Sequence, residues 1–469
     1  MRASPICCIQ RLDRLRKDPG SPPQPWPILA TDAEGYTVLH TKRATLLAVV
    51  ALTAVTVGAC SSSKSTASGG GGGSSAPAGT SGAGASSSSG SGCGDKAITV
   101  GLLTDITGLA ASGNATSVTG VKAGIAAAAR MGCKFTLAPV ADSQTNPSTV
   151  LSAAKKLVQQ DHAFAVIGNS ALLFGAAPFL TQQGVPVVGA AEDGPEWLKS
   201  DNMFSVYGNI DTTKVFTTFG AFFKLVGGTT FGSIGYAISP SSAEAAKSSA
   251  ESAKAVGLKV GYVNAKVPFG STDTEPIALA MKDAGVDAIN PATDPNSAFS
   301  LISALRNLGL NPKMLLSTGY GSDILQAGTG ALKAAQNVYF ANSFEPVEMQ
   351  TAATKQFQAD LQSVGENGVP TASMYNGYAA MLLLAQGISG AGPNASQSAV
   401  IKALQGIHQF NAGGLTGDKT VDPSDRSGNS FSPGNCQWIT EISGDVFKLV
   451  QGADPICGTL VPGVTVSAS

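Results

Sequence analysis

Polar and small residues gather in short segments that follow runs of β-branched and apolar residues, where a folded chain could bind a ligand. The candidate ligand-binding residues are Thr107, Ser112, Asn169, Ser170, Ala190, Ala191, Glu192, Tyr236, Thr293, Asp294 and Tyr320. The small residues among them allow backbone N–H groups to approach a ligand carboxylate. This pattern predicts that a small polar molecule binds in loops at the carboxyl ends of strands.

Two of these residues have both a chemical interpretation and a structural one. Ser170 stands at the start of a predicted helix, where its hydroxyl and the helix dipole could bind a carboxylate or where it serves as the N-cap. Asp294 could hold an ammonium group, but it precedes Pro295 and could instead cap the next helix. Tyr236 and Tyr320 are expected to close over the ligand.

The sequence contains no motif of a catalytic or metal centre. G-x-S-x-G, H-E-x-x-H and G-x-x-x-x-G-K-[ST] are all absent. After the predicted leader only His162 and His408 remain, which leaves little material for general base catalysis. The acidic pair Glu192-Asp193 is typical of a solvated turn. We therefore expect no catalytic residue, no metal site and no cofactor, and predict that the protein is not an enzyme.

The N-terminal region is typical of a bacterial lipoprotein precursor. Lys42 and Arg43 precede an uncharged apolar run, residues 44–59, that is shorter than the roughly 20 residues needed to span a bilayer. Residues 57–60 (VGAC) resemble the lipobox, in which Cys60 is acylated; a short buried helix is the alternative. Residues 1–59 are assigned to the leader, with 38–59 as the signal peptide and the proline-rich segment 1–37 as a misassigned start.

Residues 60–93 read as a lipidated, flexible tether, because almost all of them are Ser, Gly, Ala, Thr or Pro. The exported chain then has four further cysteines, an even number that favours two disulfides. Three pairings are possible, and we favour Cys93 with Cys133 and Cys436 with Cys457, because each pair flanks local strand-like sequence. Zinc is the competing interpretation, although no C-x-x-C spacing occurs.

Length and charge exclude further classes of protein. The 469 residues are 43% hydrophobic and 13% charged, with a formal net charge of −1. This length suggests two to three ordinary domains. No cluster of Lys and Arg is present, and a nucleic-acid partner is therefore not expected.

From residue 95 onward, short β-branched runs alternate with Ala-rich helical runs. The expected strands are 98–103, 135–140, 164–167 and 185–189 and, after a break near 207–211, 232–238, 259–263, 287–290, 313–317 and 337–341. Helices are expected between them, for example at 118–131, 148–160, 241–256 and 296–308. A hairpin is expected at 437–450. This order predicts an α/β fold with two mostly parallel sheets, hence two lobes with a cleft between them.

Several segments, in the same order along the chain, resemble the leucine/isoleucine/valine-binding family of type I periplasmic solute receptors. They are ITVGLLTDITGLAASGNATSVTGVKAGIAAAARM (98–131), DSQTN (142–146), KKLVQQD (155–161), FAVIGNS (164–170), GVPVVG (184–189), FSLISALRNLGL (299–310) and MYNGYAAMLLLAQGI (374–388). The resemblance implies two Rossmann-like lobes joined by three crossovers. Lobe 1 would comprise residues 94–210 and 341–412, and lobe 2 residues 211–340 and 413–469, with the last crossover near 413–417.

One departure from the family concerns the ligand. Relatives that bind amino acids generally have Ser or Thr after the fourth strand, where this chain has Gly189-Ala190-Ala191-Glu192-Asp193. Two carboxylates there would repel a ligand carboxylate unless they point outward. The ligand could therefore be an amide, a cation, a polyol or another small solute rather than leucine.

The resemblance implies a receptor that is lipid-anchored at the outer face of the bacterial cytoplasmic membrane. It would capture a small polar ligand, an amino acid or a related amide or small solute, and deliver it to the permease and ATPase subunits of an ABC importer. The alternative is a ligand-sensing module that reports to a membrane receptor without transport. In either case we expect a monomer.

Overall fold

The computed structural model of the protein describes residues 92–192, 194–326 and 328–469. The predicted leader (1–59), the lipidation site Cys60 and all but the last two residues of the predicted tether lie outside the described residues, as does Asp193. Within the described ranges, none of the helices has the length and apolar character needed to cross a membrane.

A six-stranded parallel sheet forms the first half of the fold. Its strands are β1 (Ile98–Thr104), β2 (Phe135–Leu137), β3 (Ala141–Asp142), β4 (Ala165–Asn169), β5 (Val187–Gly189) and β6 (Met203–Ser205). They lie in the order β2-β1-β4-β5-β6, and β3 also pairs with β1. All five residues of β4 are buried, as expected of a parallel strand covered on both faces.

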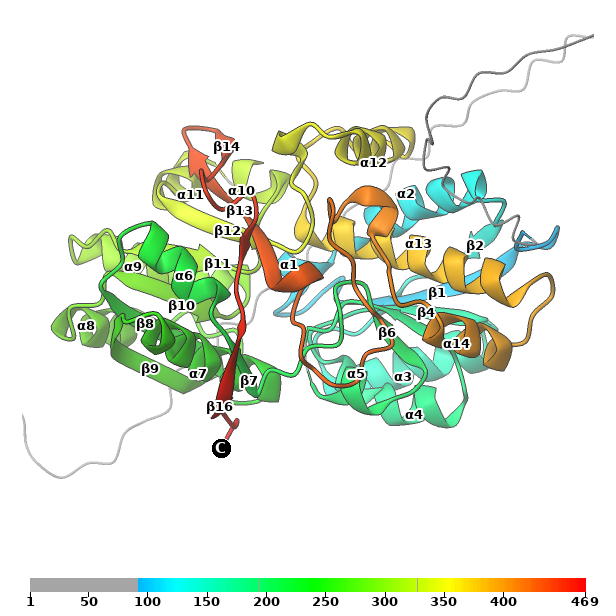
Figure 1. Cartoon of the computed structure of the whole chain (residues 1–469), viewed down its shortest axis with the longest axis horizontal. Helices are drawn as coiled ribbons and strands as arrows, with labels where there is room; N and C mark the ends of the chain where they lie inside the picture. The colour runs from blue at the N-terminus through cyan, green and yellow to red at the C-terminus, as the bar shows by residue number, and fades with distance from the viewer. Residues whose placement is uncertain (1–91, 193, 327) are drawn as a thin grey trace, which may run out of the picture. The chain divides into compact units, whose positions relative to one another are not determined.

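Helices from two separate stretches of the chain cover this sheet (Figure 1). The first stretch contributes α1 (Ala111–Asn114), α2 (Ser117–Arg130), α3 (Pro147–Gln159), η1 (Leu173–Gly175), α4 (Ala177–Gln182) and α5 (Glu196–Lys199). The second contributes α12 (Ala352–Ser363), α13 (Ala372–Ala391) and α14 (Gln397–Gln405). α2 packs closely on α13 because Gly120 has no side chain: a Cβ there would lie 2.1 Å from the Met374 carbonyl oxygen. The second stretch therefore belongs with the first sheet.

An eight-stranded sheet forms the other half, in the order β14-β13-β12-β11-β10-β8-β9, with β15 beside β13. The parallel strands are β8 (Thr230–Tyr236), β9 (Lys259–Val267), β10 (Ala288–Ala292), β11 (Lys313–Leu316) and β12 (Val338–Asn342). The antiparallel strands are β13 (Cys436–Ser443), β14 (Val446–Leu449) and β15 (Ile456–Cys457). The helices of this half are α6 (Thr218–Leu225), α7 (Pro240–Ala255), α8 (Glu275–Asp283), α9 (Pro295–Asn307), α10 (Ser322–Gln326) and α11 (Thr329–Ala334).

The chain passes between the two halves three times: after β6, after β12 and after α14. The second connection contains η2 (Val347–Met349), and the third contains η3 (Ala412–Gly414) and η4 (Pro433–Asn435). In the third, the Arg426 guanidinium donates hydrogen bonds to the carbonyl oxygens of Trp197 (2.8 Å) and Met203 (2.7 Å). These contacts favour a crossing later than the predicted 413–417. The lobe boundaries themselves stay predictions.

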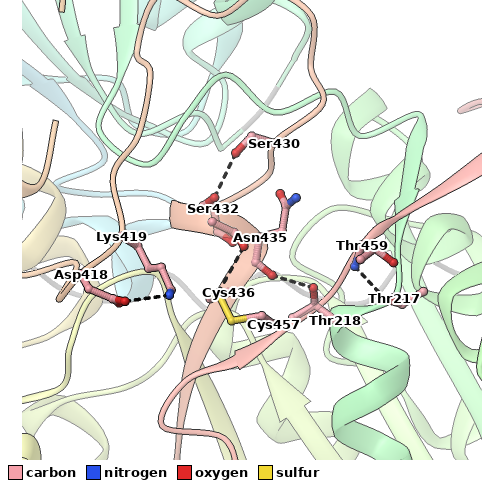
Figure 2. Close-up of a disulfide and its surroundings, with 11 residues drawn as sticks. Thr217, Thr218, Asp418, Lys419, Ser430, Ser432, Asn435, Cys436, Cys457 and Thr459 are labelled. Atoms are coloured by element: carbon pink, nitrogen blue, oxygen red, sulfur yellow. Dashed lines mark hydrogen bonds and ion pairs between the residues drawn. A yellow bond between two sulfur atoms is a disulfide. The ribbon is translucent and has the colours of Figure 1, made fainter. Parts of the chain in front are cut away.

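The C-terminal residues tie the first and third connections together (Figure 2). β16 (Leu460–Thr465) pairs antiparallel with β7 (Lys214–Phe216) in the first connection. The Thr459 amide donates to the Thr217 hydroxyl at 2.9 Å, and the Thr218 hydroxyl donates to the Asn435 carbonyl at 2.9 Å. A disulfide joins Cys436 to Cys457 beside these bonds.

Both disulfide pairings favoured from the sequence are present, because Cys93 is also bonded to Cys133. The predicted α/β class with mostly parallel sheets is confirmed, and so is the hairpin, formed by β13 and β14. The predicted strand 135–140 is too long, because β2 ends at Leu137. Pro139 lacks a backbone N–H and cannot continue the ladder.

Candidate ligand-binding site

A cavity of about 360 Å³ lies where the carboxyl ends of strands from the two sheets meet. Residues after β4 and β5 form one wall, and residues at the ends of β8, β10, β11 and β12 form the opposite wall. The start of α13 and parts of the first and third connections complete the lining. This is the position at which open α/β sheets bind their ligands.

Five of the residues predicted from the sequence line this cavity: Ala191, Glu192, Tyr236, Thr293 and Asp294. The first two follow β5 in the first sheet, and the others belong to the second sheet or its loops. The structure therefore brings together residues from both halves, as expected if the loops after strands bind a ligand. The Thr293 hydroxyl is buried and has no hydrogen-bond partner among the described residues.

Asp294 has the structural role that was one of its two predicted interpretations. It is the N-cap of α9, and its carboxylate accepts hydrogen bonds from the amides of Asn296 (2.8 Å) and Ser297 (3.2 Å). Its second oxygen accepts a hydrogen bond from the Tyr236 hydroxyl. Burial and the neighbouring Asp294 charge both raise the pKa of Tyr236. The phenol therefore stays neutral and donates its proton to the Asp294 carboxylate at the cavity wall.

Glu192 connects the first sheet to other parts of the lining. Its side chain accepts a hydrogen bond from the Asn376 amide of α13 at 3.3 Å. Its carbonyl oxygen accepts one from the Ser241 hydroxyl of α7, also at 3.3 Å. The second contact crosses from the first half of the fold to the second beside the cavity. Movement of one half relative to the other would break it.

Ser170 does not line the cavity, because its hydroxyl is bonded inside the first half of the fold. It donates to the carboxylate of Asp105 at 2.9 Å, and the Ala171 amide donates to the other carboxylate oxygen at 2.8 Å. Asn114 donates to the same carboxylate at 2.8 Å, and Ser143 also hydrogen-bonds to it. Asp105 is completely buried. The place predicted for a ligand carboxylate is thus filled by a carboxylate of the chain itself.

Three further predicted residues lie in the first half without lining the cavity. Thr107 donates through its hydroxyl to Asp142 at 2.6 Å. Asn169 is buried, and its side-chain amide donates to the Ser373 hydroxyl at 3.3 Å. Ala190 is buried beneath the surface of its loop. The side chains of Thr107 and Asn169 thus bond other segments of the first half.

The last two predicted residues, Ser112 and Tyr320, line a smaller neighbouring cavity of about 130 Å³. The Tyr320 hydroxyl donates to the carboxylate of Glu348, in the second connection, at 2.7 Å. Burial raises the pKa of Glu348 above its ordinary value. Because Tyr320 is 2% exposed, it does not close over the main cavity in this arrangement.

Aromatic side chains make up much of the lining that the sequence did not predict. They are Tyr207, Phe216, Phe219, Phe269, Phe344, Tyr375 and Phe431. Phe216 and Phe431 have ring centroids 5.1 Å apart, and Tyr236 and Phe269 4.7 Å apart. Tyr207 and Phe431 lie in irregular parts of the connections, and Phe216 ends the three-residue strand β7, which is too short to show a periodicity in the sequence. The start of α13 falls in a segment that carried the family resemblance.

The charged lining is mainly acidic. Glu192, Asp211 and Asp294 line the cavity, and Lys214 is the only basic side chain among the described lining residues. The Lys214 ammonium donates to the Ser427 carbonyl (2.5 Å) and to the Asn429 side-chain oxygen (2.7 Å). Within residues 92–469, leaving out 193 and 327, no group of three or more His, Cys, Asp or Glu is arranged to hold a metal ion.

Comparisons with known proteins agree with this architecture. No curated protein matches the chain by sequence. Similar solved structures include a possible leucine/isoleucine/valine-binding protein from Rhodopirellula baltica (16% identity, 76% of this chain and 96% of that one, TM-score 0.62). Another is a leucine-binding protein from Thermotoga maritima (19%, 75% and 97%, 0.61). A third is a branched-chain amino acid transporter substrate-binding protein from Streptococcus pneumoniae in complex with isoleucine (18%, 76% and 99%, 0.61).

These structures share the fold, and the sequence adds membership of a family. The sequence profile of periplasmic binding proteins matches residues 97–445, which include both sheets up to the turn between β13 and β14. The residues that line the cavity all lie inside this range. The chain therefore belongs to the periplasmic binding protein family.

Proposed function

We propose that this protein is an extracytoplasmic receptor that captures a small polar solute, an amino acid or a related amide or other small solute, and delivers it to an ABC importer. One observation carries the proposal: the cavity has walls from both halves of the fold. Its volume of about 360 Å³ lies in the range of small-molecule sites. A ligand bound to both walls favours the arrangement in which they are close.

The transport partners are the permease and ATPase subunits of the importer. A permease can recognise the loaded receptor if ligand binding changes the relative position of the two halves. The contact between Ser241 and Glu192 is one that forms only when the halves are close. We propose that the protein acts as a monomer and has no enzymatic activity; the cavity lining, which comes from many separate segments, supports a binding role.

The location rests on the N-terminal sequence. Lys42 and Arg43, the apolar run 44–59 and Cys60 in VGAC support a lipoprotein signal peptide, and the Ser/Gly-rich segment supports a tether to the membrane. Replacing Cys60 by Ala should move the protein from the membrane fraction to the soluble extracytoplasmic fraction. Retention of Cys60→Ala in the membrane fraction would refute lipid anchoring at this residue.

The receptor function is tested by thermal melting of the purified protein with a broad panel of small solutes, together with analysis of each solute afterwards. A bound solute raises the melting temperature, since a ligand at 100 times its Kd stabilises the folded state by about 2.7 kcal/mol. Conversion of the solute would refute a pure receptor. Loss of uptake of that solute in cells lacking the protein separates transport from sensing.

A further inference from the structure

We propose that the cavity between the two halves selects an organic cation with an apolar body, such as a quaternary ammonium compound or an amine without a free carboxylate. This inference rests on the proposed receptor function and names the chemical class of its ligand. Three independent features carry it: the internal carboxylate of Asp105, the charges of the lining and its aromatic rings.

The first feature is that the donors predicted to bind a ligand carboxylate already bind a carboxylate of the chain. The Ser170 hydroxyl and the Ala171 amide point to the Asp105 carboxylate, at 2.9 and 2.8 Å. Asp105 is completely buried and also accepts a hydrogen bond from Asn114. A ligand carboxylate could use these donors only by displacing Asp105, which would leave a buried charge without its partners.

The second feature is the charge balance of the cavity. The three acidic lining residues come from three different places: Glu192 follows β5, Asp211 lies in the first connection and Asp294 follows β10. Lys214, the single basic residue in the part of the lining that the structure describes, directs its ammonium to Ser427 and Asn429 of the third connection. The lining therefore attracts a cation, and a low-dielectric enclosure strengthens this attraction relative to water.

The third feature is the set of aromatic rings. Tyr236, Phe269 and Phe219 approach the cavity from the second half, and Phe216 and Phe431 from the connections. Phe431 contacts both Phe216 and Phe219, with centroids 5.1 and 5.8 Å apart. Aromatic rings attract cations through their electron-rich faces and bury apolar groups at the same time. An inorganic cation or a strongly hydrated polyol would leave this surface unused.

The same arrangement explains how such a ligand would favour closure of the two halves. A cation between Glu192 and Asp294 interacts with both halves, because these residues follow strands of different sheets. Its positive charge offsets the repulsion between the two carboxylates when the walls approach. Binding energy from both sides then favours the closed arrangement that a permease would recognise.

The test uses two pairs of probes in calorimetric titrations of the intact purified protein. Choline is compared with 3,3-dimethylbutan-1-ol, its neutral isostere, and leucinamide with leucine, which adds a carboxylate. We expect the cationic member of at least one pair to bind roughly tenfold or more tightly than its counterpart, and high salt to weaken that binding.

Variants locate the effect in the cavity. Glu192→Gln and Asp211→Asn should each weaken binding of the cation by roughly tenfold, the cost of one strong charge interaction. Glu251→Gln is the matched control, because Glu251 pairs with Lys254 on α7 and does not line the cavity. It should bind like the unaltered protein.

Each outcome decides the ligand class. Binding of leucine or the neutral alcohol in preference to both cations would overturn the inference and leave the receptor function standing. Failure of all four probes would also overturn it, while the solute panel judges the receptor function separately. If Glu251→Gln weakened binding as much as Glu192→Gln, the attraction would be a general surface effect and the assignment to the cavity would be wrong.

Discussion

The two halves of the fold use the carboxyl ends of their strands differently. In the first half, Asp105 follows β1 and collects hydrogen bonds from segments near residues 114, 143 and 170, all within that half. In the second half, Asp294 follows β10, caps α9 and borders the cavity. Aspartates at similar positions of the two sheets thus have different roles. Asp105 rigidifies the wall formed by the first half, and Asp294 supplies an acidic group to the wall formed by the second half. Acidic residues after strands cannot be assigned to ligand binding by position alone.

The largest expected effect is that of Asp105→Ala, which should destabilise the first half of the fold. It removes the acceptor of the Ser170 hydroxyl, the Ala171 amide and the Asn114 side chain, and leaves these buried donors without a partner. We expect the free energy of unfolding to fall by about 3 kcal/mol or more. Urea denaturation measures this change. A loss below about 1 kcal/mol would mean that the carboxylate is not the anchor of this wall.

A smaller effect on stability is expected from substitutions of Asp294, which borders the cavity in the second half. Asp294→Asn retains an N-cap acceptor and removes the charge, whereas Asp294→Ala removes both. The Ala variant should lose about 1 kcal/mol of stability and the Asn variant much less. Both should weaken binding of an organic cation by roughly tenfold. Denaturation and calorimetric titration of the same samples separate the two roles, and equal stability losses in the two variants would contradict the separation.

The fold was more predictable from the sequence than the site, for physical reasons. β-branched runs alternating with Ala-rich runs indicate buried parallel strands and helices, because that periodicity is set locally. Ser170 was misleading as a ligand residue because its partner Asp105 is 65 positions away and only the tertiary structure joins them. Asp211 and Phe431 lie in irregular connections, where no periodicity marks the side chains that meet at the cavity.

The smallest effect concerns the edge of the first half, where Asp142 holds Thr107. Partial burial raises the pKa of Asp142, but hydrogen bonds from the Thr107 hydroxyl and from the amides of Gln144, Thr107 and Ile106 outweigh it and lower the pKa below 3.8. A lowered pKa means that the stabilisation is present above pH 3.8 and is lost as pH falls through the folded-state value.

Thr107→Val should therefore cost about 0.5 kcal/mol at pH 6, a small value because the pair is exposed to solvent. The difference from the unaltered protein should shrink below pH 3.8. Chemical denaturation at several pH values measures this trend, with Thr107→Ser as the variant that keeps the hydroxyl. A cost that stays constant down to pH 2.5 would show that packing, not the carboxylate, explains the effect.

Native mass spectrometry tests the central claim, that the cavity between the two halves captures a small solute, most directly. The protein is measured as purified from its own host, and again after unfolding, refolding and incubation with the small-molecule extract of that host. We predict a complex with one small molecule per chain, lost on unfolding and restored by the extract. The bare protein mass in every sample, including the one incubated with extract, would contradict the claim.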